Sequence, residues 1–402
     1  MAYGGESNRV SWIGEPPSTT QFAAYLIVGV VGMMICGVQP VLLGALVAEK
    51  RLSAAGLGWA TTAEFLTLGL GILAAGALLK PRRLRLIAIG SALVTGLADI
   101  AVLYGDGSWI LVNRAISGFG EAGLVWITGC MIARSPTPAR WAGIYVTLQT
   151  VSQLLFAALM PLSLIATYGA DGGFIGMALT AAGAAMAALF LPERMEDLPA
   201  SEHTRLRVLS SPSAVLVLAS VFLIAAFSIG LFVYIAPLAL QAGLTGPQLG
   251  FVVSVVLGTQ ILGSMAATLL PRLPYYPIFI ACLVANALIL AILWMLPGFW
   301  MFMIASALFG FMWLFFLPYQ LPMAVEVDPT RQIAVVLGGA QLLGGSAGPF
   351  LCSFFVTDAD SRYALIVVGV CFLVAFAISS VQHLHAHKLP GTEFDRPVTG
   401  RP

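Results

Sequence analysis

The sequence predicts an all-α integral membrane protein in which twelve transmembrane helices form two six-helix pseudo-repeats. Its 402 residues are 59% hydrophobic and 9% charged, with a mean hydropathy of +0.95, whereas about 25% of residues are charged in a soluble globular protein. Apolar runs of about 20 residues, each long enough to cross a bilayer, recur along the chain. The alternating pattern of barrel strands is absent, so the spans are predicted to be helices.

The apolar runs define the predicted elements in order. Residues 1–21 are polar and lack the features of a cleavable signal, so the first run is expected to remain as a span. The predicted spans are residues 22–47, 57–79, 84–104, 109–133, 140–167, 174–191, 213–240, 247–270, 275–296, 299–325, 332–356 and 363–382.

The basic residues predict the orientation of these spans. Of the nineteen lysine and arginine residues, fifteen fall on the side of the two termini. Lys50, Arg51 and Arg362 fall on the opposite side, and Arg114 lies within a span. By the positive-inside rule, both termini are expected in the cytoplasm. Very short loops without a glycosylation sequon favour a bacterial inner membrane.

A polar stretch divides the spans into two sets of six. It covers residues 192–212 and is predicted to be a cytoplasmic linker between an N-terminal half, residues 1–191, and a C-terminal half, residues 213–402. The two halves match at a constant offset of 192 residues. The matches include Leu57 with Leu249, Gly58 with Gly250, Gly118 with Gly310, and Gln149 with Gln341. Such a parallel repeat is typical of secondary transporters.

Two motifs carry a resemblance to a known family. Residues 76–83 read GALLKPRR, a glycine followed by a basic turn between spans 2 and 3, and residues 114–120 read RAISGFG. With the repeat, these motifs resemble the major facilitator superfamily over nearly the whole chain. The resemblance implies two halves that rock around a central site lined by spans 1, 4, 7 and 10. The glycine-proline motif that drug/proton antiporters of the family carry in span 5 is missing from residues 149–161.

One face of span 4 carries charge. At 100° per residue, Arg114, Ser117 and Glu121 share this face. Glu121 falls near the middle of the span, and Arg114 lies two helical turns nearer the outside. Ionisable groups inside a membrane usually face a protein interior or a wet cavity. Glu121 is therefore predicted to carry a coupled proton, with structural pairing or direct substrate contact as alternatives.

Two further acids lie at a depth close to that of Arg114. Glu64 in span 2 and Asp99 in span 3 could form a mutually neutralising cluster with this arginine. Both belong to the proton-coupling candidates, and a purely structural ion pair is the alternative for each.

The substrate site is predicted from polar and aromatic residues on spans that the resemblance assigns to the cavity. Arg114 and Ser117 contribute an ionisable wall, and the second half contributes an aromatic one, although packing or lipid contact also explains an aromatic stripe. Gln149 and Gln341 are cavity candidates whose alternative role is hydrogen bonding between helices. The other candidates are Gln39, Phe227, Tyr234, Trp313, Phe316 and Gln320.

The predicted function is proton-coupled symport of a small organic anion, aromatic or otherwise amphipathic. Proton-antiport efflux of lipophilic compounds is the alternative, and a non-transporting membrane sensor or scaffold is the third. No nucleophile–base arrangement, Walker loop or HExxH motif occurs, so an enzyme or primary pump is not expected. The five cysteines fall inside spans without a CxxC pair, so no metal or cofactor is expected. The expected partners are a small-molecule substrate, protons and lipid, with no nucleic acid and a monomeric state.

Overall fold

The computed structural model describes residues 12–196, 212–270, 274–320 and 332–388. The residues before position 197 form these helices: α1 (Thr19–Gly32), α2 (Met34–Ala48), α3 (Ala54–Leu78), α4 (Leu84–Ala101), η1 (Val102–Tyr104), α5 (Ser108–Arg134), α6 (Pro138–Leu159), η2 (Met160–Leu162) and α7 (Leu164–Ala188). The later residues form α8 (Pro212–Gln241), α9 (Gly246–Leu269), α10 (Tyr275–Trp294), α11 (Phe299–Phe316), η4 (Leu317–Tyr319), α13 (Gln332–Ser353) and α14 (Tyr363–Lys388).

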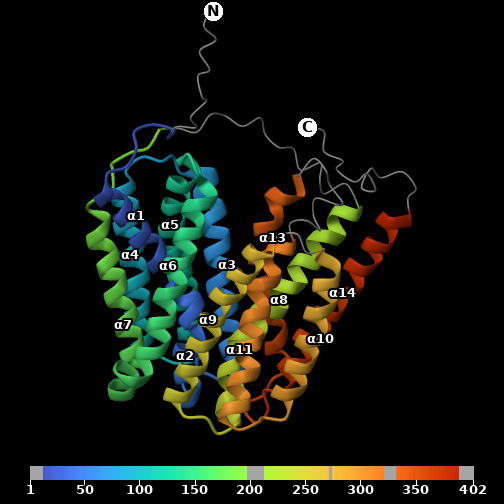
Figure 1. Cartoon of the computed structure of the whole chain (residues 1–402). Coiled ribbons are helices and arrows are strands. Elements are labelled where there is room, and N and C mark those ends of the chain that lie inside the picture. The colour runs from blue at the N-terminus through green and yellow to red at the C-terminus, as the bar shows by residue number, and fades with distance from the viewer. Residues whose placement is uncertain (1–11, 197–211, 271–273, 321–331, 389–402) are drawn as a thin grey trace, which may run out of the picture.

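These helices are the predicted membrane spans. Among the described residues, eleven helical segments are long and apolar enough to cross a membrane, counting α1 and α2 together as one. Helix α13 is the remaining long helix and completes the predicted set of twelve. In Figure 1 the helices before residue 197 lie on the left, and α8, α10, α13 and α14 lie on the right. Most of the predicted linker, residues 197–211, lies outside the described residues.

The first span is broken near its middle. Helix α1 ends at Gly32 and α2 begins at Met34, with Met33 between them at φ −114° and ψ 7°. The Met33 carbonyl accepts a hydrogen bond from Gln153 Nε2 at 2.6 Å, and the Gly29 carbonyl accepts one from the Tyr145 hydroxyl at 3.0 Å. Each carbonyl also accepts a backbone hydrogen bond of 3.2 Å, Met33 from the Cys36 amide and Gly29 from the Met33 amide. Side chains of α6 therefore add a second, shorter hydrogen bond to carbonyls near the break.

The fifth and sixth spans differ from their predicted bounds. The fifth was expected to run to residue 167, but α6 ends at Leu159 and η2 at Leu162. The sixth was expected to begin at residue 174, but α7 already begins at Leu164 and bends at Gly169, whose φ is +63°. The sequence TYGADGG is polar and glycine-rich, so hydropathy did not identify this first part of the helix as a span. In the tenth span, regular α-helix ends at Phe316 and is followed by η4, which contains Pro318; the predicted end at residue 325 lies outside the described residues.

Repeat-related glycines set the helix packing within each half. A Cβ added to Gly118 of α5 would collide with the Glu64 carbonyl of α3, and one added to Gly310 of α11 would lie 2.5 Å from the Val256 carbonyl of α9. Both the glycines and the carbonyls are 192 positions apart. The same close helix contact therefore occurs once in each half.

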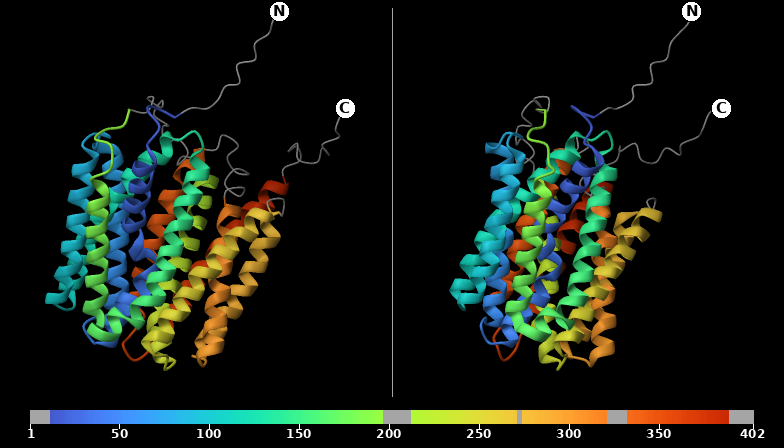
Figure 2. Two further views of the ribbon diagram at one scale, coloured as in Figure 1. Left: turned by 60° about the vertical axis from the view of Figure 1, so that its left-hand side comes forward. Right: turned by 90° about the vertical axis from the view of Figure 1, so that its left-hand side faces the viewer.

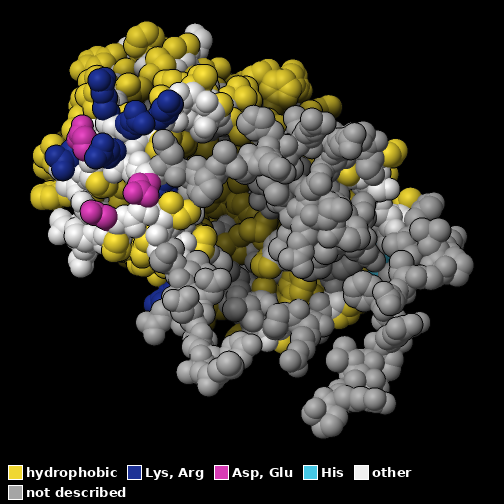
Figure 3. All heavy atoms as spheres, turned by 90° about the horizontal axis from the view of Figure 1, so that it is seen from above, with side chains coloured by type: hydrophobic (Ala, Val, Ile, Leu, Met, Phe, Trp, Pro, Cys, Tyr) yellow, Lys and Arg dark blue, Asp and Glu magenta, His cyan; other side chains and the backbone are white. Residues whose placement is uncertain are grey.

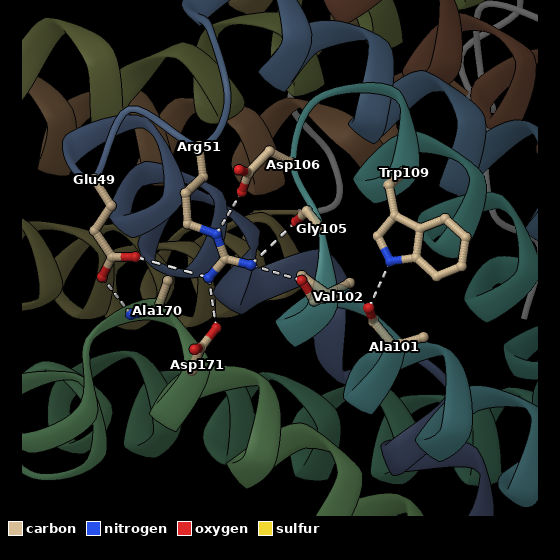
Figure 4. A network of polar contacts seen from close by, with 9 residues as sticks. All are labelled: Glu49, Arg51, Ala101, Val102, Gly105, Asp106, Trp109, Ala170 and Asp171. Atoms are coloured by element: carbon tan, nitrogen blue, oxygen red, sulfur yellow. Dashed lines mark hydrogen bonds and ion pairs between the residues drawn. The ribbon is translucent and has the colours of Figure 1, made fainter.

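Arg51 joins two turns and helix α7 at the end of the first half that lies away from the start of α1 (Figure 4). Its Nε donates to Asp106 at 2.9 Å, and its Nη1 donates to Asp171 at 2.5 Å. Its Nη2 donates to the carbonyls of Val102 at 2.6 Å and Gly105 at 3.2 Å. One guanidinium thus connects the α2–α3 turn, the η1–α5 turn and α7.

Helix α7 makes a further contact with this network. The Ala170 amide donates to Glu49 Oε1 at 2.6 Å, beside the bend at Gly169 (Figure 4). A side chain at position 169 would both strain the positive φ and collide with the Glu49 carboxylate.

The long helices of the molecule run along one common direction, as the two views in Figure 2 show.

Candidate functional site

A buried cluster of charges lies inside the first half. Arg114 Nη1 contacts Glu64 Oε1 at 2.8 Å, and Nη2 forms a second ion pair with Asp99 Oδ1. The three side chains come from α5, α3 and α4, and all are buried. The Arg114 guanidinium carbon also lies 5.0 Å from the ring centroid of Phe174 in α7. The structure therefore brings together the three groups that were predicted at similar depth.

Close helix approach explains how the carboxylates reach this arginine. Gly118 packs against the backbone of α3 at Glu64, while a Cβ on Gly120 would lie 2.8 Å from the Ser91 carbonyl of α4. The two glycines of the RAISGFG motif therefore allow α5 to pack closely against two helices, Gly118 against α3 and Gly120 against α4. Glu64 and Asp99 are then within reach of Arg114.

Gln39 and Glu121 extend the cluster in different ways. Gln39 Nε2 donates to Glu64 Oε2 at 3.1 Å. Glu121 accepts one hydrogen bond, from Ser117 Oγ to its Oε1, at 3.3 Å. Its Oε2 has no hydrogen-bond partner among the described residues, although the residue is only 1% exposed. Because an unsatisfied buried oxygen is costly, it needs an explanation beyond packing.

A central cavity of about 430 Å³ lies beside this cluster, between helices of both halves. Its volume falls in the range of small-molecule sites, about 300–1,000 Å³. Its aromatic lining consists of Phe65, Phe232 and Trp313. Its polar lining comprises Gln149, Thr150, Gln153, Ser228, Gln260, Gln320 and Gln341. Seen from the end where α1 begins, the molecule has a hollow lined by hydrophobic side chains (Figure 3).

Three hydrogen bonds among the described residues join the halves away from the start of α1; one runs from the Ala54 amide to Asp358 Oδ1 at 2.7 Å, and the other two are related by the repeat. Thr62 Oγ1 of α3 donates to the Ser346 carbonyl of α13 at 3.0 Å. Ser254 Oγ of α9 donates to the Leu154 carbonyl of α6 at 3.2 Å. The donors are 192 positions apart in the sequence, and so are the acceptors. We call these two bonds the paired latches.

Glycines allow close contact beyond the latches. A Cβ on Gly58 would lie 2.5 Å from both the Pro349 carbonyl and the Tyr234 hydroxyl. A Cβ on Gly250 would lie 2.7 Å from the Ala157 carbonyl, which is the repeat counterpart of the Pro349 carbonyl. The cavity is therefore closed on this side, and it faces the end of the molecule where α1 begins.

The break between α1 and α2 separates the cavity from the charge cluster. Met33, Cys36 and Gly37 line the cavity. On the other side, a Cβ on Gly32 would lie 3.1 Å from the Glu121 carbonyl. Movement at the break can therefore affect both the cavity and the surroundings of Glu121.

The predicted site residues fall into three groups. Gln149, Trp313, Gln320 and Gln341 line the cavity. Gln39, Arg114 and Ser117 belong to the charge cluster with Glu64, Asp99 and Glu121. Phe227, Tyr234 and Phe316 are buried in the core and do not line the cavity in this conformation.

The aromatic residues show why the cavity face was harder to predict in the second half than in the first. Phe227 packs 5.9 Å from Phe309 and 4.5 Å from Phe372, within the second half. The lining face of α8 instead contains Ser228 and Phe232. Aromatic content alone did not separate a core face from a cavity face.

Sequence reasoning missed Gln153 and Gln260. Gln153 follows Gln149 by four residues and shares its helix face, a spacing that could have found it. Gln260 is an amide near the middle of a strongly apolar span, and a polar side chain at that depth usually hydrogen-bonds to another helix or faces a cavity. Among the described residues, no group of three or more His, Cys, Asp or Glu side chains is arranged to hold a metal ion.

Membrane-length helices around a central cavity are the architecture of a secondary transporter. A family model described as "Major Facilitator Superfamily" matches residues 22–351. The chain therefore belongs to the Major Facilitator Superfamily. It is a membrane transporter rather than an enzyme, and it takes a small-molecule substrate.

Solved structures share this fold at low sequence identity. One is a bacterial homologue of the human lysosomal transporter Spinster, in an inward-facing and unoccupied conformation, with 15% identity and a TM-score of 0.68 over 93% of this chain and 100% of that chain. Another is a mutant of the nucleoside transporter NupG, with 13% identity and a TM-score of 0.73 over 90% and 99% of the two chains. No curated protein sequence matches this chain.

Proposed function

We propose that the chain is a proton-coupled secondary transporter that moves a small amphipathic organic solute by alternating access. The solute binds in the central cavity, and Glu121 carries the coupled proton. The observation that carries this proposal is the buried Glu121 carboxylate, which, unlike Glu64 and Asp99, forms no ion pair with Arg114 and has one oxygen without a hydrogen-bond partner among the described residues.

The charge cluster supports this role for Glu121. Arg114 is in direct contact with two carboxylates, Glu64 and Asp99, so its charge is already shared. Glu121 has only the Ser117 hydroxyl at 3.3 Å. Buried charge without a partner is costly in a membrane, so Glu121 is the member of the cluster best suited to exchange a proton.

An anionic substrate, as predicted from the sequence, needs a cationic partner. Arg114 does not line the cavity in this conformation and is held by Glu64 and Asp99. Binding of an anion to Arg114 therefore requires one of these carboxylates to release it, and protonation of that carboxylate would allow this.

Efflux of lipophilic compounds is the second candidate. The cavity lining is mainly apolar, and Phe232 and Trp313 lie 5.7 Å apart at its wall. Such a wall suits a flat apolar compound moving in either direction.

We infer the orientation from the basic residues. Lys80, Arg82, Arg83 and Arg85 are exposed at the end where α1 begins, and basic side chains gather on this face (Figure 3). By the positive-inside rule this end is cytoplasmic, in a bacterial inner membrane. The cavity then opens to the cytoplasm, and we expect a monomer.

Transport by Glu121→Gln tests the coupling. In proteoliposomes with a solute that binds, we expect the pH gradient to drive accumulation by the wild type and not by the variant. Exchange of labelled for unlabelled solute should persist, because it needs no net proton movement. Glu193→Gln, an exposed change near the end of α7, is the matched control. Accumulation that survives in Glu121→Gln would exclude this residue as the proton carrier.

A further inference from the structure

The polar lining of the cavity is formed by amides and hydroxyls. Gln149 and Gln153 of α6 lie on one wall, Gln260 of α9 on another, and Gln320 and Gln341 at the opposite side. Among the described lining residues, none is Asp, Glu, Lys, Arg or His. The site therefore offers neutral donors and acceptors.

Some of these amides have unused hydrogen-bonding capacity. Gln260 is only 6% exposed and makes no hydrogen bond to the described residues through its side chain, and Gln149 makes none either. Gln341 Nε2 donates to Gln320 Oε1 at 3.0 Å, which leaves the Gln320 amide nitrogen and the Gln341 carbonyl to other partners. These amides face the cavity, so a ligand that excludes water from it must pair with them or leave them unsatisfied, and a ligand that pairs with them is favoured.

Aromatic rings add a flat apolar surface next to the amides. Trp313 lies 5.7 Å from Phe232 and is stacked against Phe309 at 5.7 Å. Phe309 holds Trp313 from the core side, while Phe232 and Trp313 line the cavity. A planar ring system can stack on such a wall, with its polar edge toward the glutamines.

Charged ligands lack a counter-charge in this cavity. The nearest cluster lies behind α2, and its single arginine is paired with Glu64 and Asp99. An ion that loses its hydration in a mainly apolar cavity without a counter-ion pays a large desolvation free energy. A neutral solute avoids this penalty and still satisfies the amides.

We infer that the cavity binds an uncharged, planar aromatic solute that carries amide, carbonyl or hydroxyl groups at its edge. This inference rests on the proposed transport function and narrows its substrate class. The coupled proton would then move without any change of charge on the solute.

Two sets of compounds test this inference, and each set contains a neutral, an anionic and a cationic compound of similar shape. The first set is nicotinamide, nicotinate and 1-methylnicotinamide, and the second is indole-3-acetamide, indole-3-acetate and tryptamine. Binding to the purified full-length protein is measured as a rise in Tm that increases with the logarithm of ligand concentration. We expect the neutral amide of at least one set to stabilise the protein more than its anionic and cationic counterparts do.

Substitution of the cavity glutamines then tests whether the neutral compound binds through their amides. Gln149→Leu and Gln260→Leu should each raise the Kd of the neutral compound by about tenfold, as expected for the loss of a buried hydrogen bond. Gln382→Leu is the matched control, because this side chain bonds to the Ser213 carbonyl outside the cavity. An unchanged Kd in both cavity variants would contradict the inference, as would stabilisation by charged members alone or by no member of either set.

The outcome is separate from that of the coupling test. A neutral compound that binds through the glutamines but accumulates without dependence on Glu121 would retain the substrate class and overturn the proton carrier. Glu121-dependent accumulation of an anion, with no binding of the neutral compounds, would retain Glu121 as the proton carrier and overturn the substrate class.

Discussion

Arg114 contributes most to the polar structure inside the first half, because its guanidinium pairs with two carboxylates from two other helices. Breaking a buried pair by removing one partner leaves uncompensated charge, at a cost of about 3–5 kcal/mol. For Arg114 two carboxylates would lose their partner at once. Stability is therefore the first property expected to respond to its substitution.

We predict that Arg114→Ala lowers the Tm of the purified protein strongly. Arg140→Ala, at an exposed position near the start of α6, should leave it unchanged. Circular dichroism or intrinsic fluorescence during heating measures both. A Tm for Arg114→Ala equal to that of the control would mean that water or lipid headgroups compensate the carboxylates.

Helix geometry alone makes part of this cluster predictable. The rise per residue sets the depth of Glu64, Asp99 and Arg114 from the span limits. The same geometry places Ser117 beside Glu121, because the two lie four residues apart on one helix face. The empty side of the Glu121 carboxylate could not be derived in this way, because it depends on the packing of α1. Gln149, Gln320 and Gln341 were among the predicted cavity residues and line the cavity, whereas the position of Gln260 depends on how α9 is rotated, which composition does not specify.

At the scale of elements, the break at Met33 is the feature that hydropathy could not reveal. Residues 22–47 form one continuous apolar run. Glycine lowers helix propensity without ending a helix in a membrane, so neither Gly32 nor Gly37 predicts where it breaks. The hydrogen bond from Gln153 identifies the position only once α6 is placed beside it.

Gln153→Leu should lower stability by about 0.5–1.5 kcal/mol, because the Met33 carbonyl loses the shorter of its two hydrogen bonds and keeps only the one from the Cys36 amide at 3.2 Å. Gln149→Leu is the matched control, since Gln149 lines the same cavity and makes no hydrogen bond to the described residues. Thermal unfolding of both variants without ligand gives the comparison. Equal Tm values would show that the break is stable without this bond.

The Arg51 network is expected to respond differently to its two obvious substitutions. Arg51→Lys keeps the charge but loses the fork that reaches Asp106 and Asp171 together with the two carbonyls. We therefore predict that Arg51→Lys and Arg51→Ala are destabilised to a similar extent. Unfolding temperatures, measured beside an exposed Lys50→Ala control, would contradict this if lysine restored the wild-type value.

At the scale of the whole molecule, the span order and the offset of 192 residues could be predicted, because hydropathy and repeat register are properties of the sequence itself. The early start of α7 was missed, since Thr167, Gly169 and Asp171 interrupt the apolar pattern. The side on which the cavity is closed was not predictable. It depends on contacts between halves, such as Gly58 against Pro349.

Closure should be sensitive to side chains at the repeat-related glycines. Gly58→Leu and Gly250→Leu each place a side chain against a backbone carbonyl of the other half. We predict that both favour a conformation in which this end is open. Spin labels at Lys50→Cys and Ala359→Cys, with the native cysteines replaced, should report longer distances. Gly129→Leu, where no atom lies within 4 Å of an added Cβ, is the control expected to leave them unchanged.

The paired latches have a consequence for the origin of the molecule. Thr62 bonds to Ser346 and Ser254 bonds to Leu154, so each half supplies one donor and one acceptor at matching positions. This is the reciprocity of an isologous interface, in which two identical subunits exchange the same contact across a twofold axis. A single six-helix ancestor could have made both latches by pairing with its own copy. Among the described residues the charge cluster occurs in the first half and has no counterpart in the second, so it is a feature that required the two copies to become different.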